Sequence, residues 1–197
     1  MAVPSPSFPP PGKSALRAEG LRRRRDFARS LTPELRAELE AALARLVLPN
    51  LAGAGVVGAY HPLADEIDPS AILAGLGEDR RPALPWFADR DSVFIWREGP
   101  ATEPGPWGVA QPPAGAEALL PDAVIVPLVL ADRSGTRIGH GKGHYDRALA
   151  HLRAGGRPVF TIGIGWENQL VDERIPADPW DIKLDAVATP REWLQCG

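Results

Sequence analysis

A single cysteine, Cys196, is present in this chain of 197 residues. One thiol cannot form an internal disulfide, and it excludes a zinc site built from several cysteines. The sequence also lacks any apolar run near the ~18 residues that a membrane helix needs, and its first residues lack the apolar stretch of a signal peptide. These absences predict a cytoplasmic protein without a membrane partner.

Several common catalytic motifs are missing as well. There is no G-x-S-x-G elbow, and the histidines His61, His140, His144 and His151 lack a metal-binding spacing such as H-E-x-x-H. The net charge of -3 argues against a general nucleic-acid partner. With 44% hydrophobic and 24% charged residues, the composition is that of a globular protein.

The N-terminal residues differ in composition from the rest of the chain. Residues 1–12 are rich in proline and serine, which predicts a disordered tail and leaves residues 13–197 as a single domain. Ser14 is a plausible N-cap for a helix that runs to about Ser30. Thr32 and Pro33 predict the start of a second helix, which continues to about residue 47 with an apolar stripe at helical spacing.

Short apolar segments alternate with helix candidates along the remainder of the chain. The predicted strands are 56–60, 83–85, 92–96, 123–131, 159–164 and 185–189, and the predicted helices are 69–76 and 145–153. This alternation predicts an α/β fold of three layers, α/β/α, around a mostly parallel, Rossmann-like sheet. Ligands of such sheets bind beyond the carboxyl ends of the strands.

A glycine-rich loop follows the most apolar of these strands. It reads Arg137-Ile138-Gly139-His140-Gly141-Lys142-Gly143-His144-Tyr145-Asp146-Arg147. Glycines let backbone N–H groups turn toward an anion, and the following helix adds its positive N-terminal end. The loop is not a P-loop, because glycine follows the lysine, and not a Rossmann fingerprint, because position 144 is histidine. A flexible turn with solvated charges is the alternative, but the cations and the acid favour an anion or nucleotide site.

Basic residues are concentrated in the first predicted helix. Lys13 and Arg17 are four positions apart and therefore share a helix face. The run Arg22 to Arg25 is interpreted as a solvated face. Lys13 and Arg17 on their own are equally compatible with a solvated face and with a binding role.

Two acidic segments and one aromatic residue are further candidates. In Asp65-Glu66-Ile67-Asp68, Asp68 precedes a proline and resembles a helix cap, whereas Glu66 has no such explanation. Asp178, Asp181 and Asp185 are typical turn formers, yet Asp146 and Asp181 are also suitable carboxylates for magnesium beside phosphate oxygens. Trp107, in a glycine–proline loop, is either a core residue or a platform on which a flat ring stacks.

Taken together in their order along the chain, these segments resemble the 5-formyltetrahydrofolate cyclo-ligase family. Its members are also called methenyltetrahydrofolate synthetases. The resemblance extends from Lys13 to about Thr189, and the glycine loop is its most specific part. The other segments that carry it are 13–17, 60–68, 107–112, 126–127, Gln169 and 181–185. Two positions depart from the family pattern: His144 stands where a second aromatic is usual, and Trp180 stands where histidine often precedes the late aspartate. These departures bear on how the substrate stacks.

The resemblance implies an ATP-dependent conversion of 5-formyltetrahydrofolate to 5,10-methenyltetrahydrofolate, with release of ADP and phosphate. It implies no protein nucleophile, with charge stabilisation by Arg137 and Lys142. The implied ATP site consists of Lys13, Arg17, Arg137, Ile138, Gly139, His140, Gly141, Lys142, Gly143, His144 and Tyr145. The implied folate site consists of His61, Glu66, Trp107 and Tyr145, and Mg²⁺ would be held by Asp146 and Asp181.

Two alternatives stay open at this point. One is another ATP-dependent ligase or kinase on the same scaffold, and the other is a non-catalytic folate- or nucleotide-binding regulator. The loop glycines, Lys13 and Asp146 are all present, which favours the enzyme. The expected partners are the two small molecules, with no nucleic acid and no membrane, and the expected state is a monomer.

Overall fold

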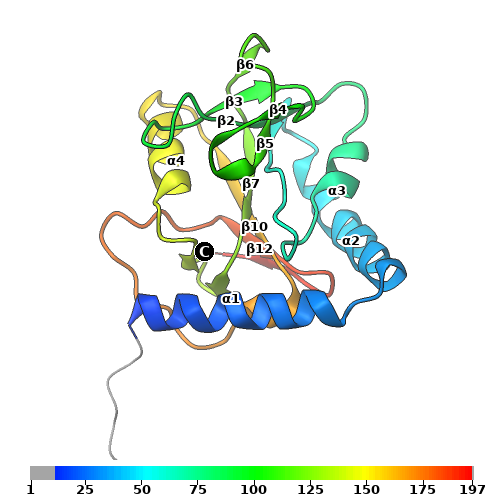
Figure 1. The fold of residues 1–197 in the computed structure, drawn as a ribbon, viewed down its shortest axis with the longest axis vertical. Coiled ribbons are helices and arrows are strands. Elements are labelled where there is room, and N and C mark those ends of the chain that lie inside the picture. Colours follow the sequence, from blue (N-terminus) through cyan, green and yellow to red (C-terminus); the bar gives the residue numbers. More distant parts are fainter. Residues whose placement is uncertain (1–11, 197) are drawn as a thin grey trace, which may run out of the picture.

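The computed structural model describes residues 12–196, and its centre is an eight-stranded sheet (Figure 1). The strands lie in the order β13-β12-β10-β7-β1-β2-β3-β6. Their bounds are β1 Val56–Gly58, β2 Arg81–Trp86, β3 Ile95–Glu98, β6 Ala118–Leu119, β7 Ala123–Pro127, β10 Phe160–Ile164, β12 Ala186–Ala188 and β13 Trp193–Gln195. The pairings from β12 through β10, β7 and β1 to β2 are parallel, and β13, β3 and β6 pair antiparallel at the two edges.

Within the described residues, four α-helices surround this sheet. They are α1 Lys13–Ser30, α2 Pro33–Val47, α3 Ser70–Ala74 and α4 His144–Ala154, with single 3₁₀ turns η1 Leu48–Leu51, η2 Pro106–Gly108 and η3 Glu167–Gln169. Helices α2 and α3 lie on one side of the sheet, α4 lies on the other, and α1 runs along one end of the molecule (Figure 1). The predicted three-layer α/β architecture is therefore confirmed.

The alternation of side chains along β7 explains why both faces of the sheet are covered. Ile125 lies in the same buried cluster as Leu43 of α2, whereas its neighbour Val126 belongs to a second cluster that contains Leu149 of α4. Successive strand residues point to opposite faces, so a strand that is apolar at every position needs a layer on each side.

A small third core attaches α1 to the rest of the molecule. A three-stranded sheet of β11 (Leu170–Val171), β8 (Leu130–Asp132) and β9 (Arg137–Ile138) lies beside α1. Leu16 and Leu21 of α1 pack against its buried cluster, which includes Val129 and Leu130. A two-stranded ribbon of β4 (Glu103–Pro104) and β5 (Ala110–Gln111) completes the structure.

The predicted strand 123–131 is divided at Pro127, and this changes the setting of the glycine loop. Proline lacks the N–H that would continue the ladder, and after it the chain leaves the central sheet and enters β8 of the small sheet. The loop therefore follows β9, the second strand of a hairpin, and not the central strand. Asp132 accepts backbone N–H groups of Ser134 and Thr136 and so fixes the hairpin turn.

Other boundaries differ from the sequence-based expectation by a few residues. Helix α1 begins at Lys13 after Gly12, so Ser14 is not its N-cap, and no side chain caps it. Thr32 does cap α2, since its Oγ1 accepts the N–H of Leu35 at 3.2 Å. The strand predicted at 92–96 is observed as β3 at Ile95–Glu98. Residues 1–11 of the predicted tail lie outside the part of the chain that the structure describes. No helix within residues 12–196 is long and apolar enough to cross a membrane.

Gly20 of α1 packs directly against Val129 and Leu130, and we expect substitution there to destabilise the fold. A Cβ atom at Gly20 would lie 2.6 Å from Cγ of Leu130 and 2.8 Å from Cγ1 of Val129. Overpacking of this kind costs roughly 1–3 kcal/mol, so Gly20→Val should lower Tm by several degrees. At Gly53 a Cβ atom would meet nothing within 4 Å, so Gly53→Val is the matched control. Equal melting temperatures of the two variants would contradict this packing.

Candidate functional site

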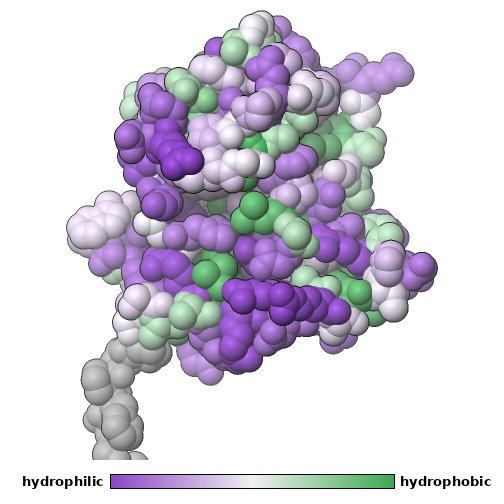
Figure 2. Space-filling view, viewed as in Figure 1, coloured by the Kyte–Doolittle hydropathy of each residue, from purple (hydrophilic) through white to green (hydrophobic). Residues whose placement is uncertain are grey.

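A cavity of about 870 Å³ lies between the start of α1, the glycine loop, the start of α4 and the β4–β5 ribbon. Its wall contains every residue that the sequence placed in a site: Lys13, Arg17, His61, Glu66, Trp107, all residues from Arg137 to Asp146, and Asp181. On the face shown in Figure 2, apolar residues reach the surface between the hydrophilic surface of α1 and the mixed surface near β4 and β5. The fold thus gathers candidates spread over most of the sequence.

The glycine loop is held against α1 by Arg17. The Nε of Arg17 donates to the carbonyl of Gly139 at 2.8 Å, and its guanidinium lies against Gly141. Gly141 has a φ of +85° and Gly143, which precedes α4, has a φ of +64°. Both are left-handed conformations that favour glycine, so these two glycines, unlike Gly139, are needed for the path of the backbone.

Lys13 is engaged by two carboxylates of the late loop. Its Nζ donates to Oδ2 of Asp178 at 2.5 Å and also to Oδ2 of Asp181. Burial is the largest single effect and opposes the charged forms, but the hydrogen bonds and the attraction between the charges together outweigh it. They raise the pKa of Lys13 and lower the pKa of Asp181. Lys13 and Asp181 are therefore both ionised over the physiological pH range.

Arg137 and Asp146 form a second ion pair in the cavity wall. Nη2 of Arg137 lies 2.6 Å from Oδ1 of Asp146, and Nη1 donates to the carbonyl of Ile182. The same carboxylate oxygen accepts the N–H of Ile182 at 3.3 Å. Both predicted magnesium ligands thus keep one carboxylate oxygen without a hydrogen bond from residues 12–196, namely Oδ2 of Asp146 and Oδ1 of Asp181.

These carboxylates fit a metal ion only if other ligands come from outside the protein. Within the described residues, no group of three or more His, Cys, Asp or Glu side chains is arranged to hold a metal. Mg²⁺ commonly takes one or two carboxylates and completes its shell with water and phosphate oxygens. The donor set of the cavity therefore suits an ion that arrives with a phosphate ligand.

Aromatic rings form part of the cavity wall. Trp107 contacts Phe87 and His144 with ring centroids 5.2 and 5.1 Å apart, and Phe94 contacts Tyr145 at 5.2 Å. Trp107 is 42% exposed with a φ of +60°, the one positive φ of a non-glycine residue in the described range. It is a wall residue and not a core residue, in line with the stacking interpretation.

The two departures from the family pattern also lie on the cavity wall. Burial, together with the positive charges of Arg147 and Lys142, lowers the pKa of His144 and keeps its imidazole neutral at pH 7. Its Nδ1 lies 3.1 Å from Nη2 of Arg147, which places it as an acceptor. Trp180 is 71% exposed at the mouth. His61 is exposed there as well.

Glu66 is the deepest carboxylate of the site and is only 5% exposed. Its Oε2 accepts the N–H of Leu63 at 2.9 Å, and its Oε1 accepts Nη1 of Arg24 at 2.9 Å. Arg24 is 1% exposed, so the expectation that the whole run from Arg22 to Arg25 is solvated was wrong at this position. The missed signal is helical spacing, because positions 13, 17, 20 and 24 form one stripe of α1.

The comparisons with known proteins agree with the resemblance seen in the sequence. The profile of the 5-formyltetrahydrofolate cyclo-ligase family matches residues 10–190. This chain belongs to that family. It is 34% identical to a 5-formyltetrahydrofolate cyclo-ligase of Mycolicibacterium smegmatis, over 94% of this chain and 97% of that protein. The corresponding values for the Escherichia coli K12 protein of the same name are 30%, 86% and 99%.

Solved structures give the same answer for the fold. The NMR structure of Aquifex aeolicus 5,10-methenyltetrahydrofolate synthetase superimposes with a TM-score of 0.71 at 26% identity, covering 93% of this chain and 92% of that one. The Mycoplasma pneumoniae synthetase has a TM-score of 0.67 at 23% identity, covering 90% of this chain and 98% of that one. The family and fold expected from the sequence are thus confirmed.

We expect Gly141→Ala to disturb the glycine loop in two ways. A non-glycine residue is strained at a φ of +85°, and its Cβ would lie 3.0 Å from Cζ of Arg17. The added strain of about 1 kcal/mol and the displacement of Arg17 should raise the KM for a phosphate-bearing substrate by roughly fivefold. Gly139→Ala adds a Cβ into open space without a positive φ, so its effect should be smaller. Steady-state kinetics of both variants test the ranking, which a larger effect at Gly139 would reverse.

Proposed function

We propose that this chain converts 5-formyltetrahydrofolate and ATP to 5,10-methenyltetrahydrofolate, ADP and phosphate. The observation that carries this proposal is one cavity that is lined by a glycine loop and cations and also by a buried carboxylate and aromatic rings. A triphosphate and a pterin ring need these two different surroundings, and the reaction requires both molecules in contact.

The triphosphate is assigned to the glycine-loop wall. Backbone N–H groups from Gly139 to Gly143 and the N-terminal end of α4 supply a site for phosphate oxygens. Lys13 and Arg17 approach from α1. The remaining residues of the proposed ATP site are Arg137, Ile138, His140, Lys142, His144 and Tyr145.

The folate is assigned to the part of the cavity around Glu66 and the aromatic rings. A pterin carries N–H groups that need an acceptor, and Glu66 is the most buried carboxylate of the cavity wall. Tyr145 and Trp107 supply the apolar and stacking surfaces, and His61 lies at the exposed edge. Burial and the nearby Glu66 carboxylate raise the pKa of Tyr145, so its phenol stays neutral beside the substrate.

The chemistry explains why ATP is needed and why no protein nucleophile is required. The formyl oxygen of an amide is a poor leaving group. Transfer of the γ-phosphoryl group to this oxygen gives an iminium phosphate, which the neighbouring N10 attacks, and phosphate then leaves. The protein supplies orientation and positive charge, and we assign the charge stabilisation to Arg137 and Lys142.

Magnesium is part of the proposal through Asp146 and Asp181. Each has one carboxylate oxygen without a hydrogen bond from the described residues, and each lies on the cavity wall near the loop. When bound, the ion would neutralise charge on the β- and γ-phosphates. The cytoplasmic location, the monomeric state and the absence of nucleic-acid and membrane partners stay predictions from the sequence.

The deciding experiment incubates purified protein with 5-formyltetrahydrofolate and Mg-ATP and follows the absorbance of methenyltetrahydrofolate. Product should form only with ATP, in equal amounts with ADP and phosphate. Binding of both ligands without product would instead indicate a regulator. Binding of ATP without binding of the folate would indicate a ligase or kinase for another substrate.

We expect Lys13→Ala to weaken the use of ATP more than the use of folate. Loss of a charge-assisted contact of roughly 1.5–3 kcal/mol should raise the KM for ATP by about tenfold to a hundredfold. Lys183→Ala removes an exposed lysine outside the cavity wall and is the control. An unchanged KM for ATP in the Lys13 variant would mean that Lys13 only ties α1 to Asp178 and Asp181.

We expect Asp146→Asn to raise the magnesium concentration needed for half-maximal activity by roughly tenfold or more. The amide removes the negative charge that attracts the ion while keeping the shape of the side chain. Asp172→Asn, at an exposed ion pair with Arg133, is the matched control. Activity is titrated against Mg²⁺ at saturating ATP, and identical curves for wild type and Asp146→Asn would remove this residue from the metal site.

A further inference from the structure

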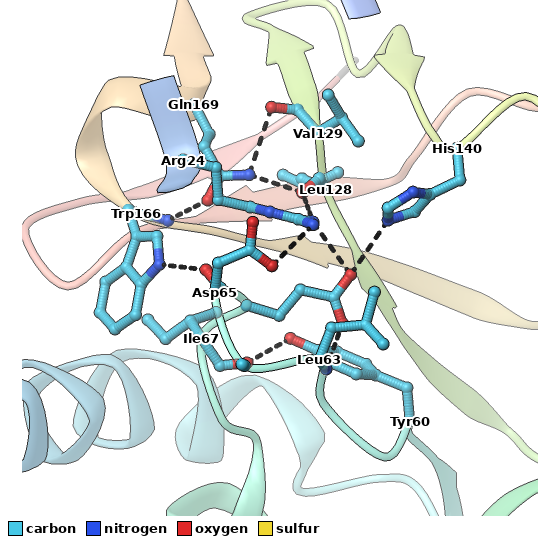
Figure 3. Close-up of polar contacts among 12 residues, drawn as sticks. Arg24, Tyr60, Leu63, Asp65, Ile67, Leu128, Val129, His140, Trp166 and Gln169 are labelled. Atoms are coloured by element: carbon cyan, nitrogen blue, oxygen red, sulfur yellow. Dashed lines mark hydrogen bonds and ion pairs between the residues drawn. The ribbon is translucent and has the colours of Figure 1, made fainter. Parts of the chain in front are cut away.

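Arg24 is a fully buried cation at the centre of a network of polar contacts (Figure 3). Nη1 donates to Oε1 of Glu66 at 2.9 Å and to the carbonyl of Leu128 at 3.2 Å, and Nη2 donates to Oδ1 of Asp65 at 3.1 Å. The planar fork of arginine thus joins α1, the turn after β1 and the end of β7. Lysine has a single nitrogen and cannot make this set of contacts in the same geometry.

The contacts of Glu66 leave a restricted direction for a ligand. A carboxylate has about four lone-pair sites, and three are occupied: by Arg24 and His140 on Oε1, and by the N–H of Leu63 on Oε2. The remaining site belongs to Oε2. Both oxygens thus have protein donors, so the orientation of the carboxylate depends on Arg24, on the N–H of Leu63 and on the contact with His140.

His140 brings the glycine loop to the same carboxylate. Its Nε2 lies 3.4 Å from Oε1 of Glu66, the same oxygen that accepts from Arg24 (Figure 3). The preceding residue, Gly139, is bound through its carbonyl by Arg17 of α1. The loop that is assigned to phosphate therefore touches, through one side chain, the acid that is assigned to the folate.

We propose that Arg24 and His140 are positioning residues that fix Glu66 and couple the nucleotide loop to the folate end of the cavity. Phosphate binding holds the loop in the conformation in which His140 donates to Glu66, and Glu66 in that state receives the folate better. The two ligands therefore bind with positive cooperativity. This inference rests on the proposed function, which assigns the glycine loop to ATP and Glu66 to the folate.

The simpler explanation is that Arg24 only anchors α1. A structural anchor would affect stability and both substrates alike, because α1 also carries Lys13 and Arg17. A positioning residue would affect the folate selectively, because it acts through Glu66. The KM values for the two substrates separate these explanations.

The first arm of the experiment uses Arg24→Lys, which keeps the buried charge and loses the fork. We expect the KM for 5-formyltetrahydrofolate to rise by about tenfold and the KM for ATP to change by less than about twofold. Arg23→Lys, one position away and exposed in a surface pair with Glu19, is the matched control. Equal changes in both KM values, or a lower Tm with both KM values unchanged, would overturn the role of Arg24.

The second arm measures coupling directly with the exposed His140, whose substitution does not threaten the fold. Calorimetry gives the Kd of 5-formyltetrahydrofolate with and without a non-hydrolysable ATP analogue and Mg²⁺. We expect the analogue to tighten folate binding in the wild type. His140→Ala should reduce this gain in folate affinity, the ratio of the Kd without the analogue to the Kd with it, by about threefold to tenfold. His151→Ala, on the exposed face of α4, should keep the full gain.

The outcomes distinguish this inference from the function on which it rests. If the wild type forms methenyltetrahydrofolate but shows no gain, or if His140→Ala keeps the full gain, the coupling is wrong and the function stands. If the wild type forms no product and binds neither ligand, the proposed function fails, and the inference fails with it. Should Arg24→Lys not fold, the His140 arm decides alone.

Discussion

The buried ion pair between Arg24 and Glu66 is the constraint on which the arrangement of the site depends. Both side chains are withdrawn from water, so each needs the other as a partner. Replacing one member of such a pair typically costs about 3–5 kcal/mol, because the remaining charge is left buried and unpaired. Glu66 is thereby fixed in the cavity wall, and α1 is fixed at one depth and one rotation against the end of the sheet.

The rotation of α1 in turn decides where the cations lie. Lys13 and Arg17 are on the same stripe as Arg24, so burying Arg24 directs both toward the cavity. Gly20 lies between Arg17 and Arg24 on that stripe and permits the close approach to Leu130. The small sheet therefore supports the helix that supplies the cations and, through β9, also begins the glycine loop.

The sequence predicted the architecture and the residues that line the cavity. It did not predict where the chain leaves the central sheet or which arginine of α1 is buried. Apolar runs and helix caps are local signals, so the elements of the parallel sheet, the cap at Thr32 and the glycine loop were identified. The division at Pro127 was missed because residues on both sides are apolar, and only tertiary packing decides that they belong to different sheets. Arg24 was missed because a run of four arginines hides which one faces inward. The very short strands β4, β5, β6 and β11 contain too few residues to give a period.

The pairing of Lys13 with Asp178 and Asp181, and of Arg137 with Asp146, has a consequence for how a charged ligand enters. These cations already have carboxylate partners, so an anion that binds them must replace one set of negative charges with another. The replaced carboxylates would then lie close to the anion and repel it. The charge balance of these ion pairs therefore disfavours a bare anion and favours one whose charge is partly neutralised by its own counter-ion.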